Sequence, residues 1–233
     1  MKKEDLSIVI AGPLDKKSLD NLNYYKSIGQ VIISYWDTCQ HNILFDYDLT
    51  DVKTIRRPLP HQYIIPYAKA YGTFSYQVYG IFHGLQICDT PYVIRTRSDE
   101  MFGNLQPLIE KFKQNTNKVV CGNILFKKWD MFKYHHGDHL FVGKTSILLN
   151  AYRSIIEGKT KNIINDVAEA VTAIAIMNEL NVELSKDGFK NAFDVIDTNE
   201  LKPFFSRFRQ QGINYNNHFP RGEFNTITNI DEL

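Results

Sequence analysis

Cysteine is scarce in this sequence, with three residues in a chain of 233. Cys39, Cys88 and Cys121 lie far apart along the chain, none belongs to a Cys-x-x-Cys pair, and an odd number cannot all pair within one chain. The sequence therefore lacks the disulfide framework that is typical of small secreted domains. We expect the protein in a reducing, cytoplasmic compartment.

Long apolar runs are also missing. No run approaches the ~18 residues that a membrane-spanning helix requires, and no hydrophobic secretory segment follows the first residues. We therefore expect a chain with no transmembrane segment, located in the cytoplasm or at the periphery of a membrane.

Neither sign of charge is in excess. Lys and Arg number 27 and Asp and Glu number 26, which gives a formal net charge of +1. A chain with so little net charge has no general electrostatic attraction for nucleic acid or for an anionic membrane surface. Nucleic acid is therefore not an expected partner.

The composition is that of an ordinary globular protein. Hydrophobic residues make up 43% of the chain and charged residues 23%, and a chain of this length can bury a full core. No repeat, linker or low-complexity tract divides it. We expect a single domain over residues 1–233, with a core at about 7–185 and residues 186–233 as a lid or tail.

Strand-like and helix-like patterns alternate from the start of the chain. A β-branched apolar run at 6–13 ends in Gly-Pro, and a second apolar run covers 30–36. Between them, Ser18 can cap a helix that Gly29 ends. Strand, helix and strand within about thirty residues predict a βαβ unit, whose strands are parallel.

The alternation continues along the rest of the chain. We expect loops and short strands at 43–71, helices at 72–88, 105–112, 145–156 and 167–180, strands at 92–96, 118–126 and 182–185, a loop at 127–143 and an irregular tail from 201. This pattern predicts an α/β fold with a mostly parallel sheet flanked by helices. Ligands of such sheets bind beyond the carboxyl ends of the strands.

The most informative segment is Tyr92-Val-Ile-Arg-Thr-Arg-Ser-Asp-Glu100. A strand that ends in Asp99 and Glu100 places two carboxylates at the carboxyl edge of the sheet, where oxygen ligands suit Mg²⁺ or Mn²⁺. Arg95 and Arg97 alternate along the strand, so both point to one face. They favour either a phosphate-binding cleft or internal ion pairs. The alternative for the two acids is a solvated turn at the start of a helix.

Histidines gather in Tyr134-His-His-Gly-Asp-His139. The string invites comparison with the zinc motif His-x-His-x-Asp-His, but Tyr134 stands where that motif has its first histidine, which disfavours zinc hydrolysis. Asp138 follows a glycine and is instead a candidate for a carboxylate that a loop holds beside a sugar hydroxyl.

Two later segments add candidates. Asp166 and Glu169 stand at the predicted start of a helix, where capping explains Asp166 better than Glu169. Either could be the base that deprotonates an acceptor hydroxyl. His218 stands in a Gly/Pro loop of the tail, which is either a flexible end or a lid that touches phosphate or metal.

Four strings carry a resemblance to a known family: Ser7-Ile-Val-Ile-Ala-Gly-Pro13, Val31-Ile-Ile-Ser-Tyr-Trp-Asp37, Tyr92-Val-Ile-Arg-Thr-Arg-Ser-Asp99 and Gly137-Asp-His-Leu-Phe-Val-Gly143. In this order, over roughly residues 7–180, the chain resembles the WavE-type lipopolysaccharide synthesis family. Those proteins look like nucleotide-sugar-dependent glycosyltransferases with a GT-A type, Rossmann-related α/β fold. The resemblance implies transfer of a sugar from a nucleotide-sugar donor, a UDP-sugar in the first instance, to a hydroxyl of a glycan or lipid-linked glycan.

The resemblance also implies roles for residues. Ser98-Asp99-Glu100 stand where GT-A enzymes carry an Asp-x-Asp metal motif, with Ser98 in place of the first acid. Together, the residues and the resemblance give a candidate site with Mn²⁺ or Mg²⁺ held by Asp99, Glu100 and His218, a nucleotide sugar bound by Gly12, Pro13, Asp37, Arg95, Arg97, Ser98 and His139, and catalysis by Asp138, Glu169 and Asp166.

Two other functions stay open. A metal-dependent nucleotidyltransferase or phosphohydrolase would use the same sheet and the same acidic strand end. A non-catalytic carbohydrate-binding module would keep the fold and bind sugar or nucleotide without turnover.

Overall fold

The computed structural model describes residues 1–39, 41–60, 73–160, 168–205 and 227–233. Strands form where β-branched and aromatic residues run together, as in Leu6–Ala11 (β1) and Gln30–Trp36 (β2), which are buried almost throughout. The other strands are β3 (Val52–Arg57), β4 (Tyr92–Arg97), β5 (Glu100–Phe102), β6 (Val119–Gly122), β7 (Leu140–Lys144), β8 (Phe193–Ile196) and β9 (Pro203–Phe205).

The helices follow the three- and four-residue spacing of apolar side chains. The α-helices of the described residues are α1 (Lys16–Leu19), α2 (Leu22–Ile28), α3 (Thr73–Gln86), α4 (Gln106–Gln114), α5 (Thr145–Ile156), α6 (Ala168–Glu179) and α7 (Lys186–Ala192). Short 3₁₀ turns occur at η1 (Lys3–Asp5), η2 (His41–Asp46), η3 (Thr198–Leu201) and η4 (Ile230–Glu232).

One seven-stranded sheet organises the described residues, in the order β3-β2-β1-β4-β7-β6-β8. Strands β3, β2, β1 and β4 are parallel to one another, and β6 is parallel to β8. Only β7 runs against its neighbours in this sheet, β4 and β6. The predicted α/β fold with a mostly parallel sheet flanked by helices is therefore confirmed.

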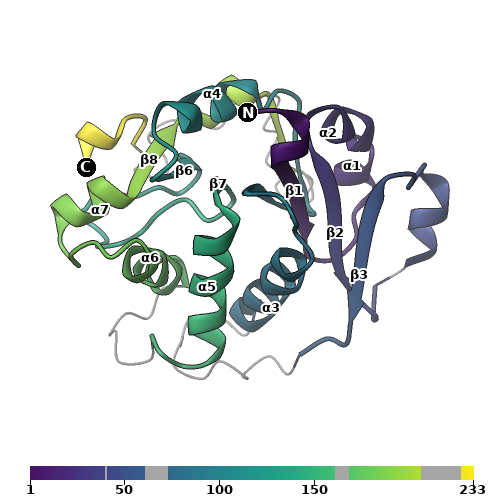
Figure 1. Cartoon of the computed structure of the whole chain (residues 1–233), viewed down its shortest axis with the longest axis horizontal. Helices are drawn as coiled ribbons and strands as arrows, with labels where there is room; N and C mark the ends of the chain where they lie inside the picture. The colour runs from purple at the N-terminus through teal and green to yellow at the C-terminus, as the bar shows by residue number, and fades with distance from the viewer. Residues whose placement is uncertain (40, 61–72, 161–167, 206–226) are drawn as a thin grey trace.

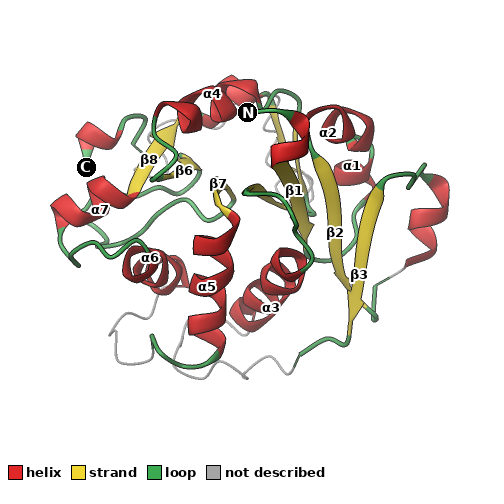
Figure 2. Cartoon of the chain, in the orientation of Figure 1, coloured by secondary structure: helices red, strands yellow, loops and turns green. Residues whose placement is uncertain are grey.

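Helices cover both faces of the sheet (Figures 1 and 2). Helices α3, α5 and α6 lie along one face, and α1, α2 and α4 lie along the other. Each face has its own apolar core: one includes Val9, Ile81 and Phe141, and the other includes Ile94 and Phe112. Full burial of one such side chain stabilises the fold by about 1.5–3 kcal/mol. Two layers of core therefore hold the sheet that positions the site.

A second, two-stranded sheet joins β5 to β9 in antiparallel register, with Glu100 opposite Phe205. The acidic segment after β4 thus enters a strand and does not begin a helix, which was the alternative prediction for it. This pairing also brings residues 203–205, from the predicted tail, beside the end of β4.

Several predicted elements differ from the structure. The helix expected to start at Ser18 is divided into α1 and α2, and Ser18 lies inside α1, where its hydroxyl donates to the Asp15 carbonyl over 3.0 Å. The strand expected at 118–126 is shorter, because the chain leaves the sheet after Gly122.

The largest differences concern strands. The predicted loop at 127–143 contains most of β7, and no strand forms at 182–185, where Ser185 caps α7 by accepting from the Gly188 amide. Strand β8 instead extends the main sheet beyond residue 185. The predicted loops at 61–71 and most of the tail lie outside the described residues.

Candidate functional site

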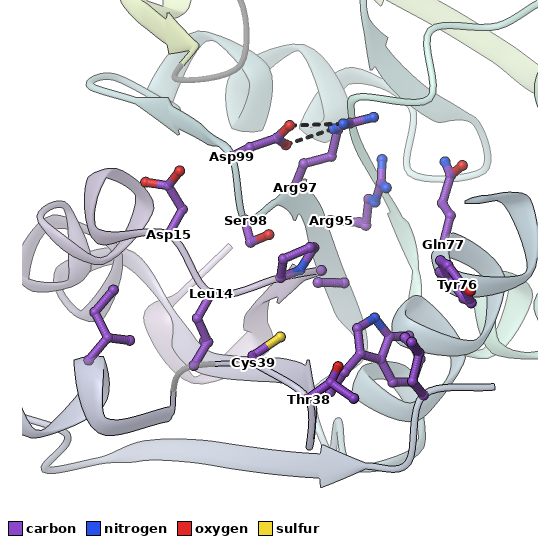
Figure 3. A pocket seen from close by; sticks show the side chains of 16 residues that line it. Leu14, Asp15, Thr38, Cys39, Tyr76, Gln77, Arg95, Arg97, Ser98 and Asp99 are labelled. Carbon is purple, nitrogen blue, oxygen red and sulfur yellow. Dashed lines mark hydrogen bonds and ion pairs between the residues drawn. The ribbon is translucent and has the colours of Figure 1, made fainter. Parts of the chain in front are cut away.

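A cavity of about 750 Å³ lies at the carboxyl ends of β1, β2 and β4. This is the edge at which the loops of a parallel sheet gather, and where its ligands bind. Its lining residues come from the ends of three strands and the turns that follow them: 11–15 at β1, 36, 38 and 39 at β2, and 95 and 97–99 at β4. The first turns of α3 add residues 76 and 77, and Ile43 and Leu59 complete the wall. Figure 3 shows these side chains around one open space.

The turn after β1 brings two backbones close together. The Ser98 amide donates to the Ala11 carbonyl over 3.2 Å, and the Gly12 amide donates to the Ser34 carbonyl over 3.1 Å. Gly12 has a φ of +136°, and a Cβ at this position would stand 2.5 Å from Ser98 Oγ. Only glycine fits both the backbone angle and the space, so Gly12 is required for the shape of the cavity floor.

Arg97 and Asp99 are joined side by side on the cavity wall (Figure 3). Arg97 Nε and Nη2 each donate to one oxygen of Asp99, at 2.9 Å, and Nε also lies 3.3 Å from Oε1 of buried Glu100. Burial alone would raise the pKa of Asp99, but the guanidinium holds it below its ordinary value. Both groups therefore stay charged, as a bidentate pair.

Arg95 lies deeper, with 1% of its surface exposed. Its Nη1 donates to the His139 carbonyl over 3.2 Å, and its guanidinium carbon lies 5.6 Å from the centre of the Phe141 ring. Arg95 and Phe141 face each other across the β4–β7 pair, so the packing follows from the register of the sheet. Cation–π contact of this kind helps to hold a buried guanidinium in place.

Behind the arginines lies a buried polar network. Gln77 Nε2 donates to Asp138 Oδ2, and His139 Nδ1 is hydrogen-bonded to Glu100 Oε1. Asp138 Oδ1 lies 3.9 Å from His139 Nε2. Burial would raise the pKa of Asp138, but His139 and the two arginines hold it well below its usual range. Asp138 is therefore an ionised, fixed carboxylate.

Glu169 has the opposite character. Its Oε2 lies 3.8 Å from His135 Nε2, and burial, with the neighbouring charge of Asp138, raises its pKa to about 7. Burial lowers the pKa of His135 to about 4, so this imidazole is neutral at pH 7. Glu169 therefore exchanges its proton near neutral pH, which suits a general base or acid.

The predicted site residues fall into five groups. Those that line the cavity are Gly12, Pro13, Arg95, Arg97, Ser98 and Asp99. Those in the buried network are Glu100, Asp138 and His139, while Glu169 belongs to the pair with His135. Asp37 is exposed after β2, where its carbonyl accepts from Arg56 over 3.4 Å, and does not line the cavity. Asp166 and His218 lie outside the described residues.

Sequence reasoning missed the aromatic side of the cavity. Trp36 ends β2 and Tyr76 stands on α3, and their ring centres are 6.5 Å apart with planes inclined at 59°. Thr38, Cys39 and Gln77 line the cavity as well. The sequence feature that could have revealed this side of the cavity is the pair Tyr76-Gln77, which interrupts the apolar stripe of the predicted helix.

Of the two acids predicted to hold a divalent cation, only Asp99 lines the cavity, and it is paired with Arg97. Both oxygens of Asp99 accept from Arg97, and Glu100 faces His139 and does not line the cavity. Among the described residues, no group of three or more His, Cys, Asp or Glu side chains is arranged to hold a metal ion. A metal at Asp99 remains a prediction, and it would compete with Arg97 for the carboxylate.

No protein-family model matches the chain, and no curated protein matches it either. The resemblance to the WavE-type family therefore remains a hypothesis. Within the described residues, no helix has the length and apolar character needed to cross a membrane.

The solved structures that are similar in part to this chain include two bacterial proteins. A 4-diphosphocytidyl-2C-methyl-D-erythritol synthase from Anaerococcus prevotii is 13% identical, with a TM-score of 0.44 over 72% of this chain and 95% of the other. HddC from Yersinia pseudotuberculosis, in complex with GMP-PN, is 10% identical, with a TM-score of 0.41 over 62% of this chain and 79% of the other. Neither likeness carries a function over to this chain.

Proposed function

We propose that this protein is a nucleotide-dependent transferase, and that it moves a sugar from a nucleotide-sugar donor to a hydroxyl of a glycan acceptor. The proposal depends above all on the cavity at the carboxyl ends of β1, β2 and β4, which joins two guanidinium groups to an aromatic wall. Its volume of about 750 Å³ lies in the range of cavities that hold cofactor-sized ligands.

The two sides of the cavity suit the two parts of a nucleotide. Trp36 and Tyr76 offer rings against which a base can pack. Arg95 and Arg97 supply positive charge beside Ser98, and guanidinium groups match the geometry of phosphate oxygens. A nucleoside diphosphate is therefore the ligand class that we expect in this space.

The same charges suit the reaction. When the bond between the sugar carbon and the diphosphate oxygen breaks, positive charge develops on the sugar ring and negative charge on the departing diphosphate. A fixed positive charge beside the diphosphate stabilises that state more than the bound donor. The acceptor oxygen forms the new bond to the sugar carbon, and its proton passes to a base.

We propose Glu169, which pairs with His135 and is not among the residues that line the cavity, as that base for a transfer that inverts configuration. Its pKa of about 7 lets it accept a proton near neutral pH, whereas Asp138 is held ionised and bound to Gln77. Asp138 then orients Gln77, which lines the cavity, and keeps the pKa of Glu169 high.

The predicted Mn²⁺ or Mg²⁺ belongs to this proposal as a cofactor that would bind at Asp99. Such an ion would add positive charge at the diphosphate. Arg97 competes with it for the same carboxylate, so the metal dependence of ligand binding is an experimental question of its own.

Nucleotidyl transfer is the second candidate, because two arginines on one cavity wall also suit the three phosphates of a nucleoside triphosphate. One experiment separates the candidates. The protein is incubated with UDP-, GDP- and CMP-sugars or with nucleoside triphosphates, with and without Mn²⁺ and a glycan acceptor. Acceptor-dependent release of UDP, GDP or CMP from the matching donor supports glycosyl transfer. Release of pyrophosphate from a nucleoside triphosphate supports nucleotidyl transfer, and binding without any turnover supports a non-catalytic carbohydrate-binding module.

A further inference from the structure

Two arginines of one strand differ in their partners. Arg97 has direct acidic partners, with two hydrogen bonds to Asp99 and a contact to Glu100. Arg95 is more deeply buried, yet its Nε has no hydrogen-bond partner among the described residues. The only hydrogen bond of its guanidinium in that part of the chain is the one from Nη1 to the His139 carbonyl.

The charge of Arg95 also lacks a direct counter-charge. Its nitrogens form no ion pair within 4.0 Å with any described carboxylate. Asp138 interacts with it only at longer range, where the charge of Arg95 helps to lower the pKa of that carboxyl. Since the arginine side chain is a cation, this position carries a buried positive charge without a close carboxylate partner among the described residues.

The guanidinium is nevertheless held in a fixed place. Phe141 lies beneath it, the His139 carbonyl accepts from one end, and the pairing of β4 with β1 and β7 fixes its backbone. The group lines the cavity close to Ser98 and Arg97 (Figure 3). Arg95 is therefore a fixed, positively charged side chain that lines the cavity, and its buried Nε has no partner among the described residues. An anion bound against this side chain would balance its charge.

We propose that Arg95 is the residue that binds a phosphate group of the ligand, and that Arg97, already satisfied by its carboxylates, contributes little to that contact. This assignment rests on the proposed function, since it places the diphosphate of the nucleotide at Arg95. It also distinguishes the two arginines of β4, because it puts the phosphate at Arg95 and leaves Arg97 paired with Asp99.

Calorimetric titration with inorganic pyrophosphate, in buffer with EDTA, tests the assignment. We expect the wild-type protein to bind pyrophosphate and Arg95→Met to weaken binding by about tenfold or more, as for the loss of a hydrogen bond to a charged group. Arg95→Lys keeps the charge but not the Nε donor, so its affinity should lie between the two. Arg153→Met, at an exposed site on α5, is the matched control and should bind like wild type.

A second measurement keeps the test valid if Arg95→Met does not fold. In the wild-type protein labelled with ¹⁵N-arginine, we expect the Nε signal of Arg95 to shift when pyrophosphate saturates the site. That signal is assigned by its loss in Arg95→Lys.

Three results overturn the assignment: no binding of pyrophosphate by the wild type, wild-type affinity in a folded Arg95→Met, or an Nε signal that does not move at saturation. The proposed function fails separately. If pyrophosphate binds through Arg95 but no nucleotide sugar is turned over, the assignment stands and glycosyl transfer does not. If nucleotide sugars are turned over equally well by Arg95→Met, the function stands and the assignment does not.

Discussion

Arg97 holds both carboxylate oxygens of Asp99, through Nε to Oδ1 and Nη2 to Oδ2, each at 2.9 Å. A guanidinium in this position occupies the place that a cation would take on the same carboxylate. A metal bound by Asp99 would therefore compete with Arg97 for this carboxylate. A substitution of Asp99 therefore tests whether a metal ion takes part in ligand binding.

We predict that Asp99→Ala abolishes the part of nucleotide affinity that depends on Mn²⁺ and leaves the fold intact. The affinity of each variant for UDP is measured by calorimetry with Mn²⁺ and with EDTA. Glu110→Gln removes a carboxylate of the exposed pair with Lys113 and is the control. Equal dependence on Mn²⁺ in wild type and Asp99→Ala would remove this carboxylate from any metal site.

Glu169 leads to a prediction about the pH dependence of turnover. The carboxylate form is the base, and its pKa is about 7, so kcat/KM should rise with pH through about 7. Glu169→Gln should lower kcat by about 100-fold or more, with little change in nucleotide affinity. Wild-type activity in Glu169→Gln, with an unchanged pH profile, contradicts the assignment.

Asp138→Asn should shift that profile. The charge of Asp138 raises the pKa of Glu169, while His139 and Arg97 lower it. Removing the Asp138 charge should therefore move the midpoint of the profile to lower pH, while the amide oxygen of asparagine can still accept from Gln77. A midpoint that stays at the wild-type pH would mean that another group controls the titration.

The stability of the protein should depend on the same proton. The pKa of Glu169 is raised on folding, from an ordinary value of 4.5 to about 7. The folded state therefore holds this proton more tightly, and the corresponding stability is present below about pH 4.5 and is lost as the pH rises through about 7. We predict that the Tm of Glu169→Gln, relative to wild type, increases between pH 4.5 and pH 8 by several degrees. A constant difference in Tm over this range would contradict the raised pKa.

The strands of the sheet could be predicted where a local run of apolar residues is enough to identify them. The apolar runs of β1, β2 and β4 are long and end in clear turns, so their positions and their parallel pairing follow from the sequence. Strand β7 was missed, because five residues, Leu140–Lys144, become a strand only by pairing with β4 and β6. Such short central strands depend on tertiary contacts that a single sequence does not show.

The candidate site was predicted in part for a similar reason. Alternation along β4 correctly places Arg95 and Arg97 on one face, and the end of that strand does border the cavity. The inward turn of Glu100 toward His139 depends on the pairing of β5 with β9, which comes from a segment about a hundred residues away in the chain. No local pattern in the sequence carries that contact.

Gly12→Ala should damage both stability and ligand binding. A φ of +136° is costly for alanine, and the new Cβ would stand 2.5 Å from Ser98 Oγ. We expect a loss of about 1–3 kcal/mol in the free energy of unfolding, with weaker binding because the cavity floor moves. Adding Ser98→Ala should relieve the steric part only, so the double variant should regain binding more than stability. Gly103→Ala, where a Cβ would meet its nearest atom at 3.4 Å, is the control.

The fluorescence of Trp36 tests whether the nucleotide binds in the cavity that this residue lines. The chain contains two tryptophans: Trp36 lines the cavity, whereas Trp129 packs against Tyr134 and Phe189 and does not line it. A base that packs against the indole changes its fluorescence, so we expect UDP to quench the wild-type emission. The quenching should vanish in Trp36→Phe and persist in Trp129→Phe, because only the first variant loses the ring that the base would contact. Quenching that persists in Trp36→Phe and is lost in Trp129→Phe would place the nucleotide elsewhere and remove the main support for the proposed function.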